Sequence, residues 1–424
     1  MTKNSMVKKR FFRKIPRAKI YLKLSSLLII FLKILLKKLG LGKKTKEWEK
    51  TLSDYFGFKE VIMLSRARLA LFYLLKNLNL PKESEIVLTP LTIADIFNAI
   101  RWARLKPVFC DLGKNTYNID YQKLEQAINP NTKAVLITHL TGLVTDMDEI
   151  QKIVEKHNLI LIEDISQAFG ATFKGKYLGT FGLASISSLS FLKTCCTLVG
   201  GVLGLNDAEL AEKIREEIKT LPPPAKSVLL KETFRNIILY LTTQRILFSL
   251  FTFNLLKIFN KLNSKMLEEF IKSNPLPILS ENPQRKLLFS YSDIQSEMGL
   301  KILKKLKSSD DQRIENAKYF MANLSPKAKS CLPIIPNDAR NVFWRLPFNA
   351  ENPEKLKKYL FDRYIDTTKT NLVLCSQEPA FKDFAAPTPE AKKAHQAIFI
   401  PTHSSFSKKD IAYMASVINK YFEV

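Results

Sequence analysis

The chain has 424 residues, of which 46% are hydrophobic and 25% charged, and its formal net charge is +26. This length predicts two or three domains, or one large α/β enzyme with extensions, and the composition excludes global disorder. With only 13 Gly, collagen-like and Gly/Ser low-complexity chains are excluded as well. The five Cys include no CxxC pair, so we expect a reducing cytoplasmic compartment and no structural metal site.

The positive charge is concentrated at the N-terminus. Residues 1–50 hold 16 Lys and Arg against two Glu, which is a net charge of +14. Such an arm indicates an anionic partner, either nucleic acid or a lipid surface. Its longest uncharged run, Leu24 to Leu32, is nine residues long, whereas a spanning helix needs about 20. No small-residue cleavage site follows an apolar run, so we also expect no signal peptide.

Placed on one helix, residues 23–44 separate into a lysine sector and an apolar sector. The apolar sector holds Leu24, Leu28, Phe31, Leu32, Leu35 and Leu39. A basic amphipathic helix suits a membrane interface, so we expect this arm to attach the protein peripherally to the inner face of a membrane. The alternative is a helix packed on the body of the protein. Nucleic acid is disfavoured as a partner, because nucleic-acid arms usually lack so many Leu and Ile.

From about residue 52 to 206, short apolar runs alternate with helical patterns. The expected strands are 61–64, 85–90, 107–112, 134–140, 159–164, 185–191 and 202–206. Amphipathic stretches such as 66–79 and 146–157 lie between them. Nearly continuous apolar strands separated by helices predict an α/β domain, whose mostly parallel sheet is covered on both faces. Ligands bind such sheets at the carboxyl ends of the strands.

The remainder of the chain departs from this alternation. Residues 236–259 are rich in apolar side chains, and only Arg245 and Lys257 are charged. We expect a helical insertion that is buried, interfacial or at a subunit contact. The pattern then predicts a helix over 289–320, a strand over 341–348 and a closing helix over 407–422. The expected organisation is an arm (1–50), a large α/β domain (51–218), an apolar insertion (219–285) and a helix with a small C-terminal α+β domain (286–424).

Two residues near the expected ligand edge indicate a particular chemistry. No P-loop, G-x-G-x-x-G or HExxH motif is present. Asp164 ends an apolar strand, Gln167 follows it closely, and Lys193 comes just after the next strand, seven residues before Gly200. Pyridoxal phosphate needs a lysine for its Schiff base and a carboxylate that keeps its pyridine nitrogen protonated. Taken alone, the pair also fits a surface lysine and a strand-end aspartate.

Longer stretches carry a resemblance to a known family. These are KPVFCDLGKNTYNID (106–120), EDISQAFGATFKGKYLGTFG (163–182) and DIQSEMGL (293–300). With the runs between them, they resemble the DegT/DnrJ/StrS family of sugar aminotransferases, which have fold type I. The resemblance covers roughly 300 residues and leaves out the arm and the insertion. It implies a pyridoxal-phosphate-dependent aminotransferase, a homodimer, that moves an amino group from an amino acid such as glutamate to a keto sugar.

The resemblance also assigns residues to roles. It makes Lys193 the Schiff-base lysine and Asp164 the partner of the pyridine nitrogen, and it brings Gln167 close to the cofactor ring. Ser188 matches the serine that bonds the cofactor phosphate. Ala67 and Arg68 align with the phosphate loop at the start of a helix, where Arg68 adds charge. The alternatives are a solvated Arg68, a structural Ser188 and a capping or surface Gln167.

Several positions depart from the family pattern. Ile93 stands where many members have a stacking aromatic residue, and Leu288-Phe289-Ser290 replaces the Asn-Tyr-Arg that reaches a neighbouring subunit's cofactor. These departures bear on cofactor affinity and on the nucleotide-sugar substrate. Two further functions therefore stay open: transamination of a lipid-linked ketone, and a catalytically retired fold that serves as a membrane-associated scaffold. For His139, Cys195 and Cys196 we expect packing roles.

Overall fold

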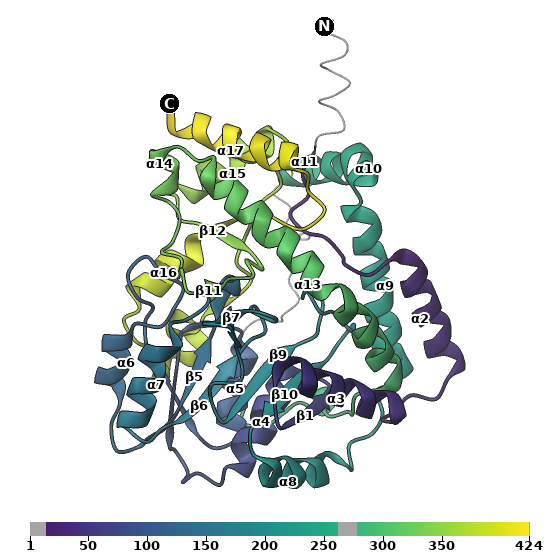
Figure 1. Ribbon diagram of the computed structural model, residues 1–424, viewed down its shortest axis with the longest axis vertical. Coiled ribbons are helices and arrows are strands. Elements are labelled where there is room, and N and C mark those ends of the chain that lie inside the picture. The colour runs from purple at the N-terminus through teal and green to yellow at the C-terminus, as the bar shows by residue number, and fades with distance from the viewer. Residues whose placement is uncertain (1–13, 262–277, 424) are drawn as a thin grey trace, which may run out of the picture.

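A seven-stranded sheet forms the centre of the protein in a computed structural model that describes residues 14–261 and 278–423 (Figure 1). The strand order is β1-β10-β9-β6-β5-β2-β4; the pairs from β9 to β4 are parallel, and β10 and β1 join the edge antiparallel. The strands are β1 (Glu60–Leu64), β2 (Glu85–Leu88), β4 (Lys106–Phe109), β5 (Thr132–Thr138), β6 (Ile160–Asp164), β9 (Ala184–Ser188) and β10 (Gly201–Leu205). The predicted mostly parallel α/β sheet is confirmed.

Helices cover both faces of this sheet, as its apolar strands require. One core cluster joins the sheet to α4 (Ala67–Asn77), α5 (Ala94–Trp102) and α8 (Ala208–Ile218). A second cluster on the other face contains residues of α3 (Lys43–Phe56), α6 (Tyr121–Ala127), α7 (Met147–Lys156) and α13 (Asp293–Ala322). Asp120, Asp146 and Asp207 cap α6, α7 and α8 through their carboxylates, so local sequence fixes where these helices begin.

A smaller C-terminal unit packs around the second half of α13. Its sheet has the order β12-β15-β13, and its core is separate from the two clusters of the large sheet. Its elements are α14 (Pro326–Lys329), β12 (Leu346–Phe348), α15 (Pro353–Asp362), β13 (Thr368–Lys369), α16 (Pro389–Gln396), β15 (Ile398–Ile400) and α17 (Lys408–Glu423). Short pairings between β11 (Ala339–Arg340), β7 (Thr172–Phe173) and β8 (Lys176–Tyr177), and between β14 (Val373–Leu374) and β3 (Leu91–Thr92), link it to the large unit.

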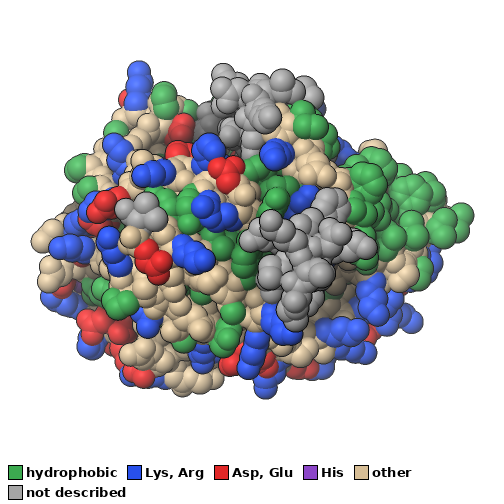
Figure 2. Space-filling view, turned by 90° about the horizontal axis from the view of Figure 1, so that it is seen from above, with side chains coloured by type: hydrophobic (Ala, Val, Ile, Leu, Met, Phe, Trp, Pro, Cys, Tyr) green, Lys and Arg blue, Asp and Glu red, His purple; other side chains and the backbone are tan. Residues whose placement is uncertain are grey.

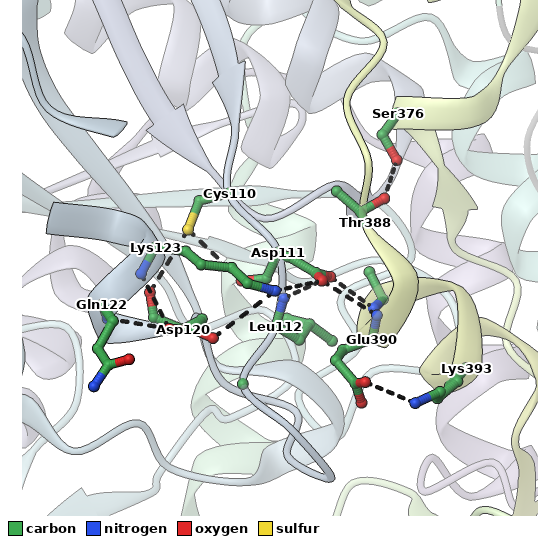
Figure 3. Close-up of polar contacts among 12 residues, drawn as sticks. Cys110, Asp111, Leu112, Asp120, Gln122, Lys123, Ser376, Thr388, Glu390 and Lys393 are labelled. Carbon is green, nitrogen blue, oxygen red and sulfur yellow. Dashed lines mark hydrogen bonds and ion pairs between the residues drawn. The ribbon is translucent and has the colours of Figure 1, made fainter. Parts of the chain in front are cut away.

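Asp111 also ties the small unit to the large one (Figure 3). Its buried carboxylate accepts hydrogen bonds from the backbone N–H groups of Glu390 (3.2 Å) and Ala391 (2.9 Å), which begin α16. The Nζ of Lys123 lies 3.0 Å from the same carboxylate. A negative charge at the first turn of a helix satisfies N–H groups that have no partner within the helix. Asp111 therefore fixes α16 against the end of β4.

The arm and the insertion pack against each other on one side of the molecule, where α2 (Leu24–Leu36) lies beside α9 (Lys226–Thr243) (Figure 1). The insertion continues through α10 (Arg245–Leu247), the π-helix η2 (Phe248–Thr252) and α11 (Phe253–Lys261). Within the described residues, no helix combines the length and the apolar content that crossing a membrane requires. Residues 1–13 of the expected arm and 262–277 of the expected insertion lie outside the described residues.

Two sequence predictions about elements are wrong in their extent. Residues 23–44 form two helices, because Lys37 is extended (φ −99°, ψ 155°) and Gly40, with φ +152°, lies in the connection to α3. Residues 341–348 form no continuous strand. Phe343 has a left-handed φ of 44°, so only Leu346–Phe348 pair as β12. This break turns the two residues before β12 toward the site described next.

Candidate active site

A cavity of about 260 Å³ lies at the carboxyl end of the parallel strands, between the large sheet and the C-terminal unit. Thr138 at the end of β5 and Asp164 at the end of β6 are paired in register, and Ser188 ends the neighbouring β9. All three line the cavity, together with Lys193 from the loop after β9. The parallel topology therefore brings together side chains that are up to 55 residues apart in the sequence.

Asp164 lies at the base of this cavity and is 6% exposed. One carboxylate oxygen accepts a hydrogen bond from the backbone N–H of Ser166 at 2.8 Å, which fixes the orientation of the group. The Asp164 carbonyl accepts from the His139 N–H at 3.2 Å. Because the backbone on both sides is bonded within the sheet, the carboxylate is held rigidly at the strand end.

Lys193 lies against an aromatic ring in the same cavity. Its Nζ is 4.3 Å from the ring centre of Trp344, whose indole N–H donates to the carbonyl of Leu192 at 3.0 Å. Leu192 has a left-handed φ of 62°, and this bond helps to hold that conformation. Burial lowers the pKa of Lys193 to about 8; the charge of Asp164 opposes this shift, and that of Arg345 adds to it. Lys193 and Asp164 are thus electrostatically coupled.

Gln167 is fixed by the backbone of a strained turn. Its Oε1 accepts from the N–H of Thr141 at 2.8 Å, and Thr141 has a φ of 61°. Since the oxygen is engaged there, the amide NH₂ is the group that Gln167 can offer to a ligand in the cavity. Gly142 follows with a φ of +85°, and a Cβ at this position would lie 2.6 Å from the backbone nitrogen of Trp344. A glycine is therefore required for the approach of Trp344.

The opposite end of the cavity offers donors suited to a phosphate. The N-terminus of α4 opens into it at Ala67, so N–H groups of the first helical turn face the space. The hydroxyl oxygens of Ser188 and Ser190 lie 2.7 Å apart. Arg68 forms an ion pair with Asp95. Arg66 lines the same space; burial lowers its pKa to about 10, with a contribution from Arg68. Arg68 is thus paired directly with an acid, whereas Arg66 has only the smaller opposing effects of Glu232 and Asp95 on its pKa.

A close backbone contact fixes this end of the cavity. A Cβ on Gly201 in β10 would collide with the backbone of Arg66 and Ala67. The glycine pair after Lys193 therefore lets the start of α4 pack directly on the sheet.

Four other residues that line the cavity were missed by the sequence analysis. Trp344 and Arg345 lie in the segment that was expected to be a strand, and an arginine within that apolar run was the available signal. Burial lowers the pKa of Arg345 to about 10, with a contribution from Arg17. Glu232 and Arg235 come from α9, one turn apart, and line the cavity from the insertion.

The N-terminal segment before α2 also reaches the cavity. Ile15 forms a parallel bridge with Ile365, and Arg17 binds both carboxylate oxygens of Asp366 at 2.5 and 2.7 Å. This seating places Arg17 and Lys19 at the cavity wall. Nothing in the local sequence distinguishes these two cations from the other basic residues of the arm.

Three residues expected to have packing roles are fully enclosed. The Nδ1 of His139 accepts from the Thr145 N–H at 3.2 Å, and its Nε2 lies 3.3 Å from the carboxylate of Glu163. Burial raises the pKa of the Cys195 and Cys196 thiols, that of Cys196 to about 12. Thiols held neutral in this way are poor nucleophiles and poor redox sensors, which agrees with a packing role.

The positions that depart from the family pattern have defined places. Ile93 lines the cavity at the start of α5. Phe289 is buried among residues of α2 and α9, and the Arg66 guanidinium lies 5.9 Å from its ring centre. Ser290 bridges to Leu64 of β1, and its N–H donates to the Pro222 carbonyl at 2.7 Å. This segment is therefore packed within its own chain.

Fold and site together define a pyridoxal-phosphate-type α/β enzyme of fold type I. The chain matches the DegT/DnrJ/EryC1/StrS aminotransferase family over residues 34–222 and 288–419, and it belongs to that family. Members of the family use pyridoxal phosphate. The cavity fits this cofactor, because it combines a lysine of lowered pKa and a fixed carboxylate with the N-terminus of a helix.

Two similar proteins are named for polysaccharide biosynthesis and for the synthesis of GDP-perosamine. The chain is 37% identical over 177 residues to the spore coat polysaccharide biosynthesis protein SpsC of Bacillus subtilis (42% of this chain, 46% of that protein). It is 35% identical over 176 residues to GDP-perosamine synthase of Caulobacter vibrioides (42% and 47%). These alignments span about half the length of the curated relatives.

Solved structures share the whole fold. The sugar aminotransferase CalS13 from Micromonospora echinospora superposes with a TM-score of 0.73 at 19% identity, covering 96% of this chain and 99% of that one. Helicobacter pylori PseC, an aminotransferase involved in the biosynthesis of pseudoaminic acid, gives a TM-score of 0.72 at 22% identity, with 97% and 99% covered.

Proposed function

We propose that this protein is a pyridoxal-phosphate-dependent aminotransferase that moves an amino group from an amino acid such as glutamate to a keto sugar. The observation that carries the proposal is the meeting of Lys193 and Asp164 in one cavity beside the N-terminus of α4. Pyridoxal phosphate, when bound, supplies an electron-accepting ring that stabilises negative charge on the carbon bearing the amine.

Each residue has a role that follows from its surroundings. The lowered pKa of Lys193 leaves a large fraction of the amine neutral near pH 8, so Nζ can hold the cofactor and then accept and return a proton. Asp164 would hold the ring nitrogen of the bound cofactor in its protonated form, because a nearby opposite charge favours the charged form. Gln167, whose Oε1 is engaged by the Thr141 N–H, would offer its NH₂ to the cofactor. Trp344 packs its ring beside the Lys193 ammonium.

The phosphate-binding roles fall on the start of α4 and the end of β9. Ala67 and Arg68 contribute backbone N–H groups, and Ser188 contributes a hydroxyl. We assign the side-chain charge to Arg66 rather than to Arg68, because Arg68 is paired with Asp95. This changes the sequence interpretation, in which the Arg68 side chain supplied that charge.

The family and the sugar enzymes among its relatives support a keto sugar as the amino acceptor. One observation favours a second candidate, a ketone carried on a lipid. Helix α9 lines the cavity through Glu232 and Arg235, and it also exposes Phe234 and Leu241 on the surface beside α2. A wall shared by the cavity and an apolar surface suits a substrate held at a membrane. Peripheral membrane attachment of the basic arm is part of this proposal, as is the homodimer that the resemblance implies.

Labelling tests the cofactor assignment. Borohydride reduction of the protein with bound pyridoxal phosphate, followed by peptide mapping, is expected to place the pyridoxyl label on Lys193. Lys193→Ala should abolish the label, whereas Lys19→Met, which removes the other lysine lining the cavity, should keep it. A label on another lysine would refute the assignment, and no label in the wild-type protein would favour the scaffold alternative.

The role of Asp164 has its own test. Asp164→Asn keeps the size of the side chain and removes its charge. We expect the conversion of bound cofactor by glutamate to slow about 100-fold or more, with the label on Lys193 retained. Unchanged conversion would show that another group holds the ring nitrogen protonated.

A further inference from the structure

Exposed apolar side chains are concentrated on two segments of this protein. Among the described residues, seventeen large hydrophobic side chains are exposed, and thirteen of them lie in residues 24–41 and 226–261. They are Leu28, Ile29, Leu32, Leu35, Leu36, Leu41, Phe234, Leu241, Ile246, Leu247, Phe251, Leu255 and Ile258. Figure 2 shows a large hydrophobic cluster on the side where α2 and α9 lie in Figure 1. Monomeric proteins rarely expose apolar patches of this kind without a binding function.

Helix α2 lies along the surface with apolar residues on both of its faces. Leu27 and Ile34 are completely buried against α9 and α13, so this face anchors the helix to the body of the protein. The outward face carries Leu28 (50% exposed), Leu32 (56%) and Leu36 (83%). A solvent-facing helix surface would be polar at these positions. The helix is therefore fixed parallel to the surface and presents a second apolar face outward.

The insertion adds a second exposed apolar stretch. Lys226 at the start of α9 donates to the Leu35 carbonyl of α2, and Phe234 on the same helix is 59% exposed. The chain continues through η2 and α11, where Phe251 is 66% exposed and Ile258 54%. Phe253 is buried and stacks on Phe361, which secures this part to the C-terminal unit. We call these exposed side chains of α2 and α9–α11 the apolar face.

Charge decides which partner fits the apolar face. No Asp or Glu occurs between residues 14 and 46, and Glu232, the one acid between 219 and 261, lines the cavity. The exposed basic residues of these segments include Lys23, Lys37, Lys38, Lys226, Lys231 and Lys257. Arg245 is exposed as well but is paired with Asp410, and Lys33 of α2 is paired with Glu297. A second copy of the chain would bring the same positive charges together, which is unfavourable. Apolar side chains bordered by lysines instead match the acyl boundary and headgroups of an anionic bilayer.

We infer that the apolar face docks onto the surface of an anionic membrane, with α2 lying in the interface. This deepens the membrane part of the proposed function and names its surface. Leu28, Leu32 and Leu36 enter the acyl boundary, and the lysines contact lipid phosphates. Because α9 contributes to both the face and the cavity, docking holds the cavity wall at Glu232 and Arg235 close to the membrane.

Vesicle flotation with the full chain tests the inference. The variant Leu28→Asn/Leu32→Asn/Leu36→Asn changes only exposed positions, so the fold should persist. We expect its partition onto vesicles of phosphatidylcholine with 30% phosphatidylserine to fall at least about tenfold, since binding scales with buried apolar area. Phe251→Asn/Leu255→Asn/Ile258→Asn should fall by a smaller factor. Ile334→Asn, at a 61% exposed position on the C-terminal unit, is the matched control and should bind like the wild type.

Other results of these experiments would overturn membrane docking by the apolar face. Wild-type protein that stays with the soluble fraction on anionic vesicles, or α2 variants that float like the wild type, would overturn the inference. So would a wild-type dimer that the α2 variant converts to a monomer while lipid binding is unchanged, because the face would then bind a second copy. Pyridoxyl labelling of Lys193 without vesicles is expected in all variants, so it separates failure of docking from failure of the proposed activity.

Discussion

At the scale of single residues, the lysine in the cavity is the most sensitive reporter of the site. Burial against Trp344 lowers the pKa of Lys193 to about 8, from a usual value of 10.5. Asp164 opposes the shift because its negative charge favours the ammonium form, and Arg345 strengthens it because two positive charges repel. The pKa therefore depends on two neighbours of opposite sign, which can be changed one at a time.

We predict that Lys193 in the cofactor-free protein titrates near pH 8, as measured by the pH dependence of its acetylation rate. Asp164→Asn should lower this pKa, because the ammonium loses its favourable partner. Arg345→Gln should raise it, because the ammonium loses a like charge. Lys152, whose pKa is raised by Glu149 on the surface, serves as the internal control and should not respond. Shifts of the same sign in the two variants would contradict the coupling.

At the scale of elements, α2 shows how tertiary contacts choose one face of a helix. Leu27 is completely buried, whereas its neighbour Leu28 is 50% exposed. Both are leucines in the first turns of the same helix, so helix propensity is identical for the two. Any difference between their substitutions must come from burial.

We predict that Leu27→Ala lowers the free energy of unfolding by about 2–5 kcal/mol, because it leaves a cavity under α2. Leu28→Ala should change it by no more than about 0.5 kcal/mol, as expected at an exposed position. Urea unfolding followed by circular dichroism measures both. Equal costs would mean that α2 does not pack on the protein as described. The comparison also shows why membrane docking is tested with point variants of α2, since removing the whole arm would remove buried core residues.

At the scale of the whole molecule, the cavity is assembled from four parts of the chain. The large sheet supplies Asp164 and Lys193, the C-terminal unit supplies Arg345, α9 supplies Arg235, and the N-terminal segment supplies Arg17. The position that the family uses to reach a neighbouring subunit is Leu288-Phe289-Ser290, which is packed inside this chain. The resemblance nevertheless implies a homodimer, so the number of chains in the active protein has to be measured.

We predict that light scattering of the purified protein gives the mass of two chains, about twice 48.6 kDa, without lipid. Pyridoxal phosphate should then dissociate more readily on dilution, if a second chain helps to close the site. A monomer that retains the cofactor tightly would contradict the homodimer. It would also mean that residues of α9 complete the cavity within a single chain.

The sequence by itself determined the α/β class, the order of the strands along the chain, and the Asp164–Lys193 pair. Short, nearly continuous apolar runs that alternate with amphipathic helices are typical of buried parallel strands, and the family motifs lie within this alternation. The tertiary structure alone decided which other groups join the pair. Arg17, Arg66, Trp344 and Arg345 lie in the arm, a helix start and a broken strand, and local patterns do not bring these segments to a shared cavity. It also decided that Leu27, Ile30 and Ile34 pack inward while the predicted apolar sector of α2 largely faces outward. Periodicity predicted one apolar sector, and only long-range packing decided which apolar side chains of α2 the protein covers.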